Sequence, residues 1–152
     1  HEADRRGRSA VLNMVITETG AAKAVAKALP ELLGKLTGNS IRVPTPNVSM
    51  AILSLTLEKA ASKEEINEFL RQVSLHSNLQ DQIDYTNSTE VVSSDFIGSR
   101  SAGVFDAQAT IVNGNRANLY VWYDNEMGYS CQVMRIAEQV SGTPYLHLPV
   151  EG

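Results

Sequence analysis

Several features are scarce or missing in this sequence of 152 residues, and each absence excludes a class of protein. Its only cysteine, Cys131, cannot form a disulfide within the chain, which fits a reducing compartment. No apolar run approaches the roughly 18 residues of a membrane span. The charged opening stretch, residues 1–8, lacks the apolar core of a signal peptide. The net charge of -4 gives no electrostatic reason to expect a nucleic-acid partner. We therefore expect a cytoplasmic protein that binds neither membrane nor nucleic acid.

The motifs of several catalytic classes are missing as well. Three scattered histidines, His1, His76 and His147, lack the spacing of a zinc site. The sequence contains no Gly-x-Ser-x-Gly elbow, no P-loop and no Gly-x-Gly-x-x-Gly cofactor fingerprint. Cys131 falls near the apolar side of a predicted helix, so we interpret it as a packed thiol. The sequence therefore predicts no metal site and no catalytic residue.

The order of predicted elements indicates the fold class. No repeat or linker interrupts the chain, which favours a single domain over residues 1–152. The residue pattern predicts extended segments at 10–16, 40–44, 50–58, 91–92, 96–97, 105–112 and 117–124, and helices at 21–29, 62–77 and from Asp124 onward. The apolar stripes expected on the last two helices are Ile66, Phe69, Leu70 and Val73, and Val133, Ile136, Ala137 and Val140. A capping box at Ser62 and a hairpin signal at Asn113-Gly114 support these boundaries. We predict an α+β fold, an antiparallel-rich sheet with helices packed on one face, with a parallel α/β layering as the alternative.

A first candidate for ligand chemistry is the turn Thr19-Gly20, which directly precedes a predicted helix. The first amides of a helix are unpaired, and the helix dipole favours an anion beside them. Thr19 adds a hydroxyl, and Gly20 allows a ligand to approach the backbone closely. The alternative is that Thr19 only caps the helix.

Arginines supply further candidates. Arg42 lies in the apolar stretch Ile41-Arg42-Val43-Pro44, where a half-buried guanidinium could bind phosphate or carboxylate through two bonds. The alternative is a strand-face arginine paired with an acid. Arg5, Arg6 and Arg8 form another cationic group near the start, unless they belong to a solvated terminal arm.

A last candidate is the segment 122–130, in which a strand passes into a helix through amide, acidic and aromatic residues. Such a junction can present the Asn125 amide to a ligand between aromatic walls. The alternative is that Asp124 or Asn125 only caps the helix.

Several long motifs in one order carry a resemblance to a known family. They are the runs 17–25, 32–38, 42–49, 92–96 and 122–130. In that order they resemble the C-terminal, catalytic domain of phosphorylating glyceraldehyde-3-phosphate dehydrogenases. The resemblance covers the chain to about Gly142 and leaves residues 143–152 as a tail.

The resemblance implies roles for particular residues. Thr19 and Gly20 would help to bind inorganic phosphate, Arg42 would serve chiefly the substrate phosphate, and Arg6 would line the anion pocket. Asn125 would hold the nicotinamide carboxamide, with Tyr129 nearby. Residues 1–9 resemble the end of the loop that meets a neighbouring subunit in the family tetramer.

The family oxidises an aldehyde phosphate, glyceraldehyde 3-phosphate or erythrose 4-phosphate, with NAD or NADP, and captures inorganic phosphate as an acyl phosphate. This sequence lacks the Ser-Cys-Thr-Thr-Asn motif of the family nucleophile and the N-terminal NAD-binding domain. Glu18 and Met127 also depart from the family pattern. We therefore expect the chain alone to be inactive and to bind no cofactor tightly. The alternative is a standalone anion-binding or interaction module derived from the enzyme.

Overall fold

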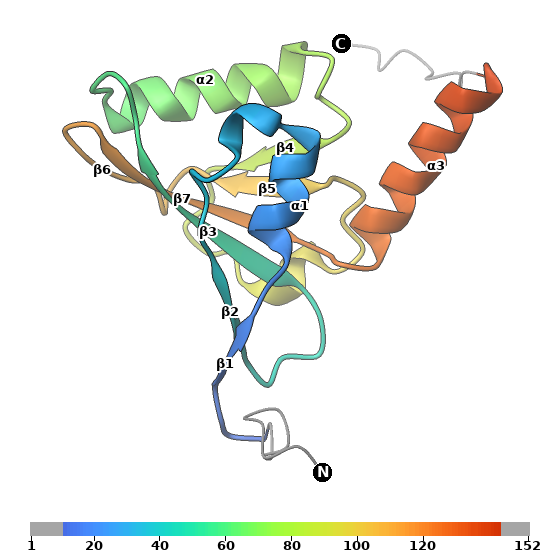
Figure 1. Cartoon of the computed structure of the whole chain (residues 1–152), viewed down its shortest axis with the longest axis horizontal. Coiled ribbons are helices and arrows are strands. Elements are labelled where there is room, and N and C mark those ends of the chain that lie inside the picture. Colours follow the sequence, from blue (N-terminus) through green and yellow to red (C-terminus); the bar gives the residue numbers. More distant parts are fainter. Residues whose placement is uncertain (1–10, 144–152) are drawn as a thin grey trace. The chain divides into compact units, whose positions relative to one another are not determined.

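A computed structural model describes residues 11–143, and the contacts within the chain divide it into two compact units. The N-terminal unit runs up to Pro46 and the C-terminal unit starts at Asn47. Figure 1 labels the helices and strands of both units. The prediction of a single domain stays a prediction.

The N-terminal unit is built on an antiparallel ribbon and one helix. Strand β1 (Val15–Glu18) pairs with β2 (Asn39–Arg42), so that Val15 lies opposite Arg42 and Glu18 opposite Asn39. Between them lie α1 (Ala21–Ala28) and the short 3-10 helix η2 (Pro30–Leu32). Pro30 has no amide hydrogen to continue α1, which is why the α-helix ends before it.

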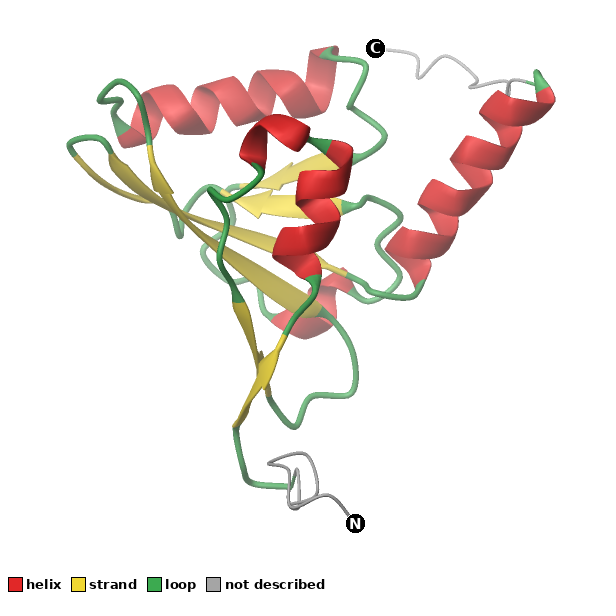
Figure 2. Ribbon diagram, in the orientation of Figure 1, coloured by secondary structure: helices red, strands yellow, loops and turns green. Residues whose placement is uncertain are grey.

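The C-terminal unit contains a five-stranded sheet, drawn in yellow in Figure 2. Its strands are β3 (Ser49–Thr56), β4 (Ile83–Thr86), β5 (Gly103–Asp106), β6 (Ile111–Asn113) and β7 (Arg116–Tyr123). The order is β3-β7-β5-β4, and β6 also pairs with β7. Only the pairing of β4 with β5 is parallel. The α+β class with an antiparallel-rich sheet is confirmed.

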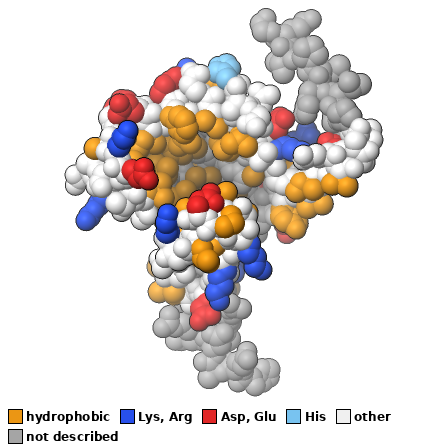
Figure 3. All heavy atoms as spheres, turned by 45° about the horizontal axis from the view of Figure 1, so that its top comes forward, with side chains coloured by type: hydrophobic (Ala, Val, Ile, Leu, Met, Phe, Trp, Pro, Cys, Tyr) orange, Lys and Arg blue, Asp and Glu red, His pale blue; other side chains and the backbone are white. Residues whose placement is uncertain are grey.

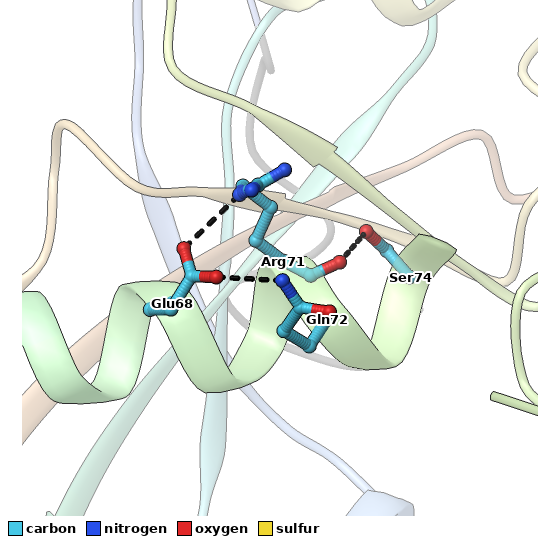
Figure 4. Close-up of polar contacts among 4 residues, drawn as sticks. All are labelled: Glu68, Arg71, Gln72 and Ser74. Atoms are coloured by element: carbon cyan, nitrogen blue, oxygen red, sulfur yellow. Dashed lines mark hydrogen bonds and ion pairs between the residues drawn. The ribbon is translucent and has the colours of Figure 1, made fainter. Parts of the chain in front are cut away.

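The helix α2 (Lys63–His76) covers one face of this sheet, because Ile66 and Leu70 pack against the buried side chains of Phe105, Ala107, Ala117 and Leu119. The predicted capping box is confirmed: Ser62 Oγ accepts from the Glu65 amide at 3.1 Å, and Glu65 Oε2 accepts from the Ser62 amide at 2.7 Å. The predicted apolar stripe of α2 was wrong to include Phe69, whose side chain is 65% exposed. The outer side of α2 carries local polar contacts among Glu68, Arg71 and Gln72 (Figure 4).

The last helix, α3 (Met127–Ser141), follows β7 and ends at Gly142, whose φ of 68° is left-handed. Here the sequence prediction was wrong about packing. Val133, Ile136 and Val140 are 46%, 61% and 83% exposed, so the expected stripe lies at the surface of the described chain. Figure 3 shows hydrophobic side chains (orange) along this helix.

Two smaller predictions were also wrong. The extended piece at 96–97 is in part the 3-10 helix η3 (Ser93–Phe96), which the Asp95 carboxylate caps by accepting from the Val92 amide at 2.8 Å. The predicted strand 105–112 is two separate strands, β5 and β6, with a turn between them. The hairpin after β6 is present, and its two turn residues are Gly114 and Asn115.

Candidate functional site

The turn before α1 has the features expected of an anion site. Thr19 Oγ1 accepts from the Ala21 amide at 3.2 Å, so Thr19 does satisfy one first-turn donor, as the capping interpretation held. The amides of Ala22 and Lys23 have no hydrogen-bond partner among residues 11–143. The first turn of α1 contains no acidic residue, so no carboxylate within that turn offsets the helix dipole. The turn can therefore still receive an anion.

Arg42 lies in the same unit as the Thr19-Gly20 turn, but at the other end of β1. It pairs with Val15, four residues before Thr19 along β1, which corresponds to about 13 Å of strand. One phosphate therefore cannot contact the α1 turn and the Arg42 backbone together. The expectation of a half-buried Arg42 was wrong: the residue is exposed, because a two-stranded ribbon leaves its edges uncovered.

Thr17 is a residue that sequence reasoning missed. Its side chain is only 7% exposed, and its hydroxyl has no hydrogen-bond partner among the described residues. A buried hydroxyl without a partner is unfavourable, which makes it a candidate ligand contact. Successive side chains of a β-strand point to opposite faces, so the buried Thr17 lies on one face of β1 and the exposed Glu18 on the other. This alternation could have predicted from the sequence that Thr17 and Glu18 lie on opposite faces. Glu18 therefore does not share the face on which Thr17 is buried.

The C-terminal unit positions Asn125 through its neighbour. Asp124 is 3% exposed, and its carboxylate accepts four hydrogen bonds from the amides of Gly98, Glu126 and Met127 and from the side chain of Asn47. These bonds, led by the one from Gly98, hold the pKa of Asp124 below its usual value of 3.8. Asp124 therefore caps α3, as the alternative interpretation of this segment proposed.

Asn125 precedes α3 by two residues and Tyr129 lies in its first turn, and both residues are exposed. The Asn125 side chain makes no hydrogen bond within the described residues, and Tyr129 is 71% exposed. The Asn125 amide, which offers both a donor and an acceptor, is thus presented to solvent four residues before the exposed Tyr129. Met127, which follows in the first turn, is 44% exposed.

Several other residues singled out by the sequence lie outside the described residues or away from the candidate site. Arg6 lies outside the described residues, as do Arg5, Arg8, His147 and the tail from residue 144. Cys131 is a free, half-buried thiol on α3. Within residues 11–143, no three His, Cys, Asp or Glu side chains gather in a way that could hold a metal ion. The helices described are all too short or too polar to cross a membrane.

A shallow depression of about 420 Å³ is lined by Asp84 and Thr86 of β4 and by Asp95, Phe96 and Gly98, and it contains none of the predicted site residues.

Comparison with known proteins decides the family. The family model described as glyceraldehyde 3-phosphate dehydrogenase, C-terminal domain, matches residues 1–125. The chain belongs to the glyceraldehyde-3-phosphate dehydrogenase family. The resemblance of the motifs is thereby confirmed, since the match covers the Thr19-Gly20 turn, Arg42 and Asn125.

Individual relatives agree with the family model. A glyceraldehyde-3-phosphate dehydrogenase-like protein of Pseudomonas aeruginosa is 71% identical over 142 residues, which is 93% of this chain and 31% of the relative. Glyceraldehyde-3-phosphate dehydrogenases of Phaffia rhodozyma and Schistosoma mansoni are 46% and 50% identical, over 90% and 86% of this chain and 40% and 38% of their own lengths. The chain thus spans less than half of each relative.

Proposed function

We propose that this chain supplies the phosphate-binding residues and the nicotinamide contact of an NAD- or NADP-dependent glyceraldehyde-3-phosphate dehydrogenase, and that it is inactive alone. The observation that carries the proposal is the α1 turn, where Ala22 and Lys23 keep free amides and the first helical turn contains no acidic residue. The substrate would be an aldehyde phosphate, glyceraldehyde 3-phosphate or erythrose 4-phosphate, and the second anion would be inorganic phosphate.

The separation of the two anion sites supports this chemistry. A reaction that joins inorganic phosphate to a phosphorylated aldehyde needs two phosphate sites held apart on either side of the reacting carbon. The Thr19-Gly20 turn would hold the inorganic phosphate and Arg42, whose backbone lies about 13 Å away along β1, would hold the substrate phosphate. Arg6 would add a further cation to the anion pocket. The fixed donors would stabilise negative charge without having to reorganise during the reaction.

The cofactor contact rests on Asn125. A carboxamide is recognised best by another amide, which can donate and accept at once, and the free Asn125 side chain fits that need. Tyr129 would form part of the wall beside it. NAD or NADP, when bound, accepts the hydride that leaves the aldehyde carbon. This chain would hold the nicotinamide end only, so we expect no tight binding of the cofactor to the chain alone.

The nucleophile and the rest of the cofactor site would come from a partner domain. A thiolate would attack the aldehyde carbon to give a thiohemiacetal, which would become a thioester by losing its hydroxyl proton to a base and its hydride to NAD or NADP. Phosphate would then cleave the thioester to give the acyl phosphate and regenerate the thiolate. The exposed α3 stripe supports the need for such a domain, because Tyr129, Val133, Ile136 and Val140 lie on one helix face at spacings of four, three and four residues. The assembled enzyme would be a homo-oligomer, a tetramer as in the family, in the cytoplasm.

The activity test uses an exchanged enzyme, in which this chain replaces the matched 131-residue segment of the Schistosoma mansoni glyceraldehyde-3-phosphate dehydrogenase. We expect NADH or NADPH formation from glyceraldehyde 3-phosphate, phosphate and cofactor with the exchanged enzyme and none with the chain alone. Activity of the chain alone would contradict the claim of inactivity. An exchanged enzyme that folds but is inactive would contradict the proposed role of the chain.

The phosphate site can be tested on the chain itself. Titration with inorganic phosphate, followed by amide NMR, is expected to shift the Ala22 and Lys23 resonances. Arg42→Ala should weaken binding of a sugar phosphate about tenfold, equivalent to about 1.4 kcal/mol. The matched control is Lys35→Ala, which removes another exposed cation of the same unit. Equal affinities for the wild type and Arg42→Ala would exclude Arg42 from the site.

The rival function, a standalone anion-binding or interaction module, is favoured by the missing cysteine motif within these 152 residues. The native mass decides between the two. An antibody against this chain should detect a species at least twice 16.5 kDa in the source cells. A sole species of 16.5 kDa would support the module.

A further inference from the structure

The buried carboxylate of Asp124 is saturated with hydrogen bonds. Oδ1 accepts from the amides of Glu126 and Met127, both at 2.9 Å. Oδ2 accepts from the Gly98 amide at 2.9 Å and from Asn47 Nδ2 at 3.0 Å. None of the four donors belongs to a cation, so neutral dipoles alone stabilise this buried charge. Only an acceptor-only group with two oxygens fits this arrangement.

These bonds join three segments that are far apart in the sequence. Asn47 precedes β3, Gly98 follows η3, and Glu126 and Met127 open α3. The bond from Glu126 also closes a ring around the backbone of Asn125, since it links the side chain of residue 124 to the amide of residue 126. Asn125 is therefore held from both sides while its own side chain stays free.

The corner formed by Asp124, the segments of Asn47 and Gly98 and the start of α3 is constrained by further backbone features. The Asn47 side chain also accepts from the Val48 amide at 2.7 Å, where Val48 has a φ of 67°, a strained value for a β-branched residue. On the other side, a Cβ on Gly128 would lie 2.7 Å from the carbonyl oxygen of Ser101, so α3 approaches that loop at backbone contact distance. Such a corner fixes the direction in which Asn125 leaves the backbone.

We propose that Asp124 is a positioning residue: its carboxylate clamps the loops of Asn47 and Gly98 to the start of α3 and so aims the Asn125 amide at the cofactor. The claim about the cofactor rests on the proposed function, whereas the claim about Asn125 does not. Asp124→Asn is the sharpest variant. It keeps the size of the side chain but turns an NH₂ group toward the Gly98 and Asn47 donors.

The first test measures ¹⁵N relaxation of the Asn125 backbone and side-chain amide in the full 152-residue chain. In the wild type we expect a backbone order parameter of about 0.85, and in Asp124→Asn a value below about 0.6. The matched control is Asp106→Asn. Asp106 is also a buried carboxylate, 7% exposed, which accepts from Trp122 Nε1 and the Ala109 amide but does not enclose Asn125.

The control separates positioning from general destabilisation. Loss of order at Asn125 in Asp124→Asn but not in Asp106→Asn supports the proposal. Loss in both variants, or in neither, overturns it. If Asp124→Asn does not fold, Asp124→Ser replaces it, because its hydroxyl still caps α3 but is too short to hold Gly98 and Asn47. The same loss of order is expected.

The second test connects the clamp to the cofactor in the exchanged enzyme. Asp124→Asn is expected to raise the KM for NAD or NADP roughly tenfold, with the KM for the aldehyde phosphate unchanged. The double variant with Asn125→Ala should be no worse than Asn125→Ala alone, because the two residues act through one contact. Additive effects would show that Asp124 does not act through Asn125. An inactive exchanged enzyme would instead contradict the proposed function and leave the relaxation result valid.

Discussion

At the scale of single residues, backbone amides hold several of the acidic side chains of residues 11–143. The carboxylates that accept from a backbone amide are those of Glu65, Asp84, Asp95, Asp106 and Asp124. By contrast, the ion pair between Glu68 and Arg71 is solvent-exposed on both sides. Exposed pairs contribute little and are screened by salt, whereas short amide bonds are not. We therefore expect the stability of the chain to depend on pH more than on ionic strength.

The pH dependence should reveal the contribution of Asp124. Because the pKa of Asp124 is lowered in the folded state, its ionised form adds stability above the ordinary value of 3.8. That stability is lost as the pH falls through the lower folded-state pKa. The free energy of unfolding, from urea titrations at each pH, should therefore drop more in the wild type than in Asp124→Asn below about pH 5. The control, Glu64→Gln, removes an exposed carboxylate and should follow the wild type. Parallel curves for the wild type and Asp124→Asn would contradict this view.

The close approach at Gly128 makes a second prediction. A methyl group there would meet the Ser101 carbonyl oxygen at 2.7 Å, and a backbone atom cannot move aside as a flexible side chain can. Gly128→Ala should lower the free energy of unfolding by about 1–3 kcal/mol, although alanine is the better helix former. Ser130→Ala, at an exposed position of the same helix, should change it by less than about 0.5 kcal/mol. A stabilised Gly128→Ala, as measured by thermal unfolding, would mean that α3 is not packed against the 99–101 loop.

At the scale of elements, the cap of α2 is the best-defined boundary. Ser62→Ala removes the acceptor for the Glu65 amide and should cost about 1 kcal/mol of stability. Chemical denaturation measures this loss, and Ser94→Ala, an exposed serine without a described side-chain hydrogen bond, is the control. Equal stabilities of the two variants would show that the cap contributes nothing measurable.

Local signals predicted those elements whose boundaries are set by local chemistry. The capping box fixed the start of α2, and Pro30 fixed the end of α1. Strand β1 begins later than predicted, at Val15, because pairing with β2 rather than hydrophobicity decides which residues are extended. Strand β4 was missed, since its four residues, Ile83 to Thr86, alternate over too short a run to be distinguished from a loop and are defined by their parallel partner β5.

The candidate site divides in the same way. The sequence pointed to Thr19, Gly20 and Asn125 because each lies next to a helix start, which is a local feature. It could not show the distance of Arg42 from the α1 turn, which depends on strand register. Nor could it show that Gly98 and Asn47 meet Asp124, because these residues are 26 and 77 positions away in the sequence.

At the scale of the whole molecule, the exposed stripe of α3 predicts a surface that a partner domain covers. Ile136→Gln with Val140→Gln should leave the melting temperature of the isolated chain almost unchanged, because both side chains already face solvent. The same pair should lower the melting temperature of the exchanged enzyme, since burial of a large apolar side chain is worth about 1.5–3 kcal/mol. Gln139→Ala on the same helix is the control. Equal effects in both proteins would exclude the stripe as a domain contact.

The register of β3 with β7 has a consequence for synthesis of the chain. Its paired residues are 60 positions apart at Thr56 and Arg116 and 74 apart at Ser49 and Tyr123. On the ribosome, β3 emerges long before its partner strand β7, and until β7 has been synthesised the backbone amides and carbonyls of β3 have no strand to pair with. Folding of the central sheet is therefore a late event, delayed until translation has passed Tyr123. A nascent chain stalled before Arg116 would leave Leu55 without Ala117 and Leu119, the β7 residues of the core against which it packs, and so expose it to chaperones and to other nascent chains.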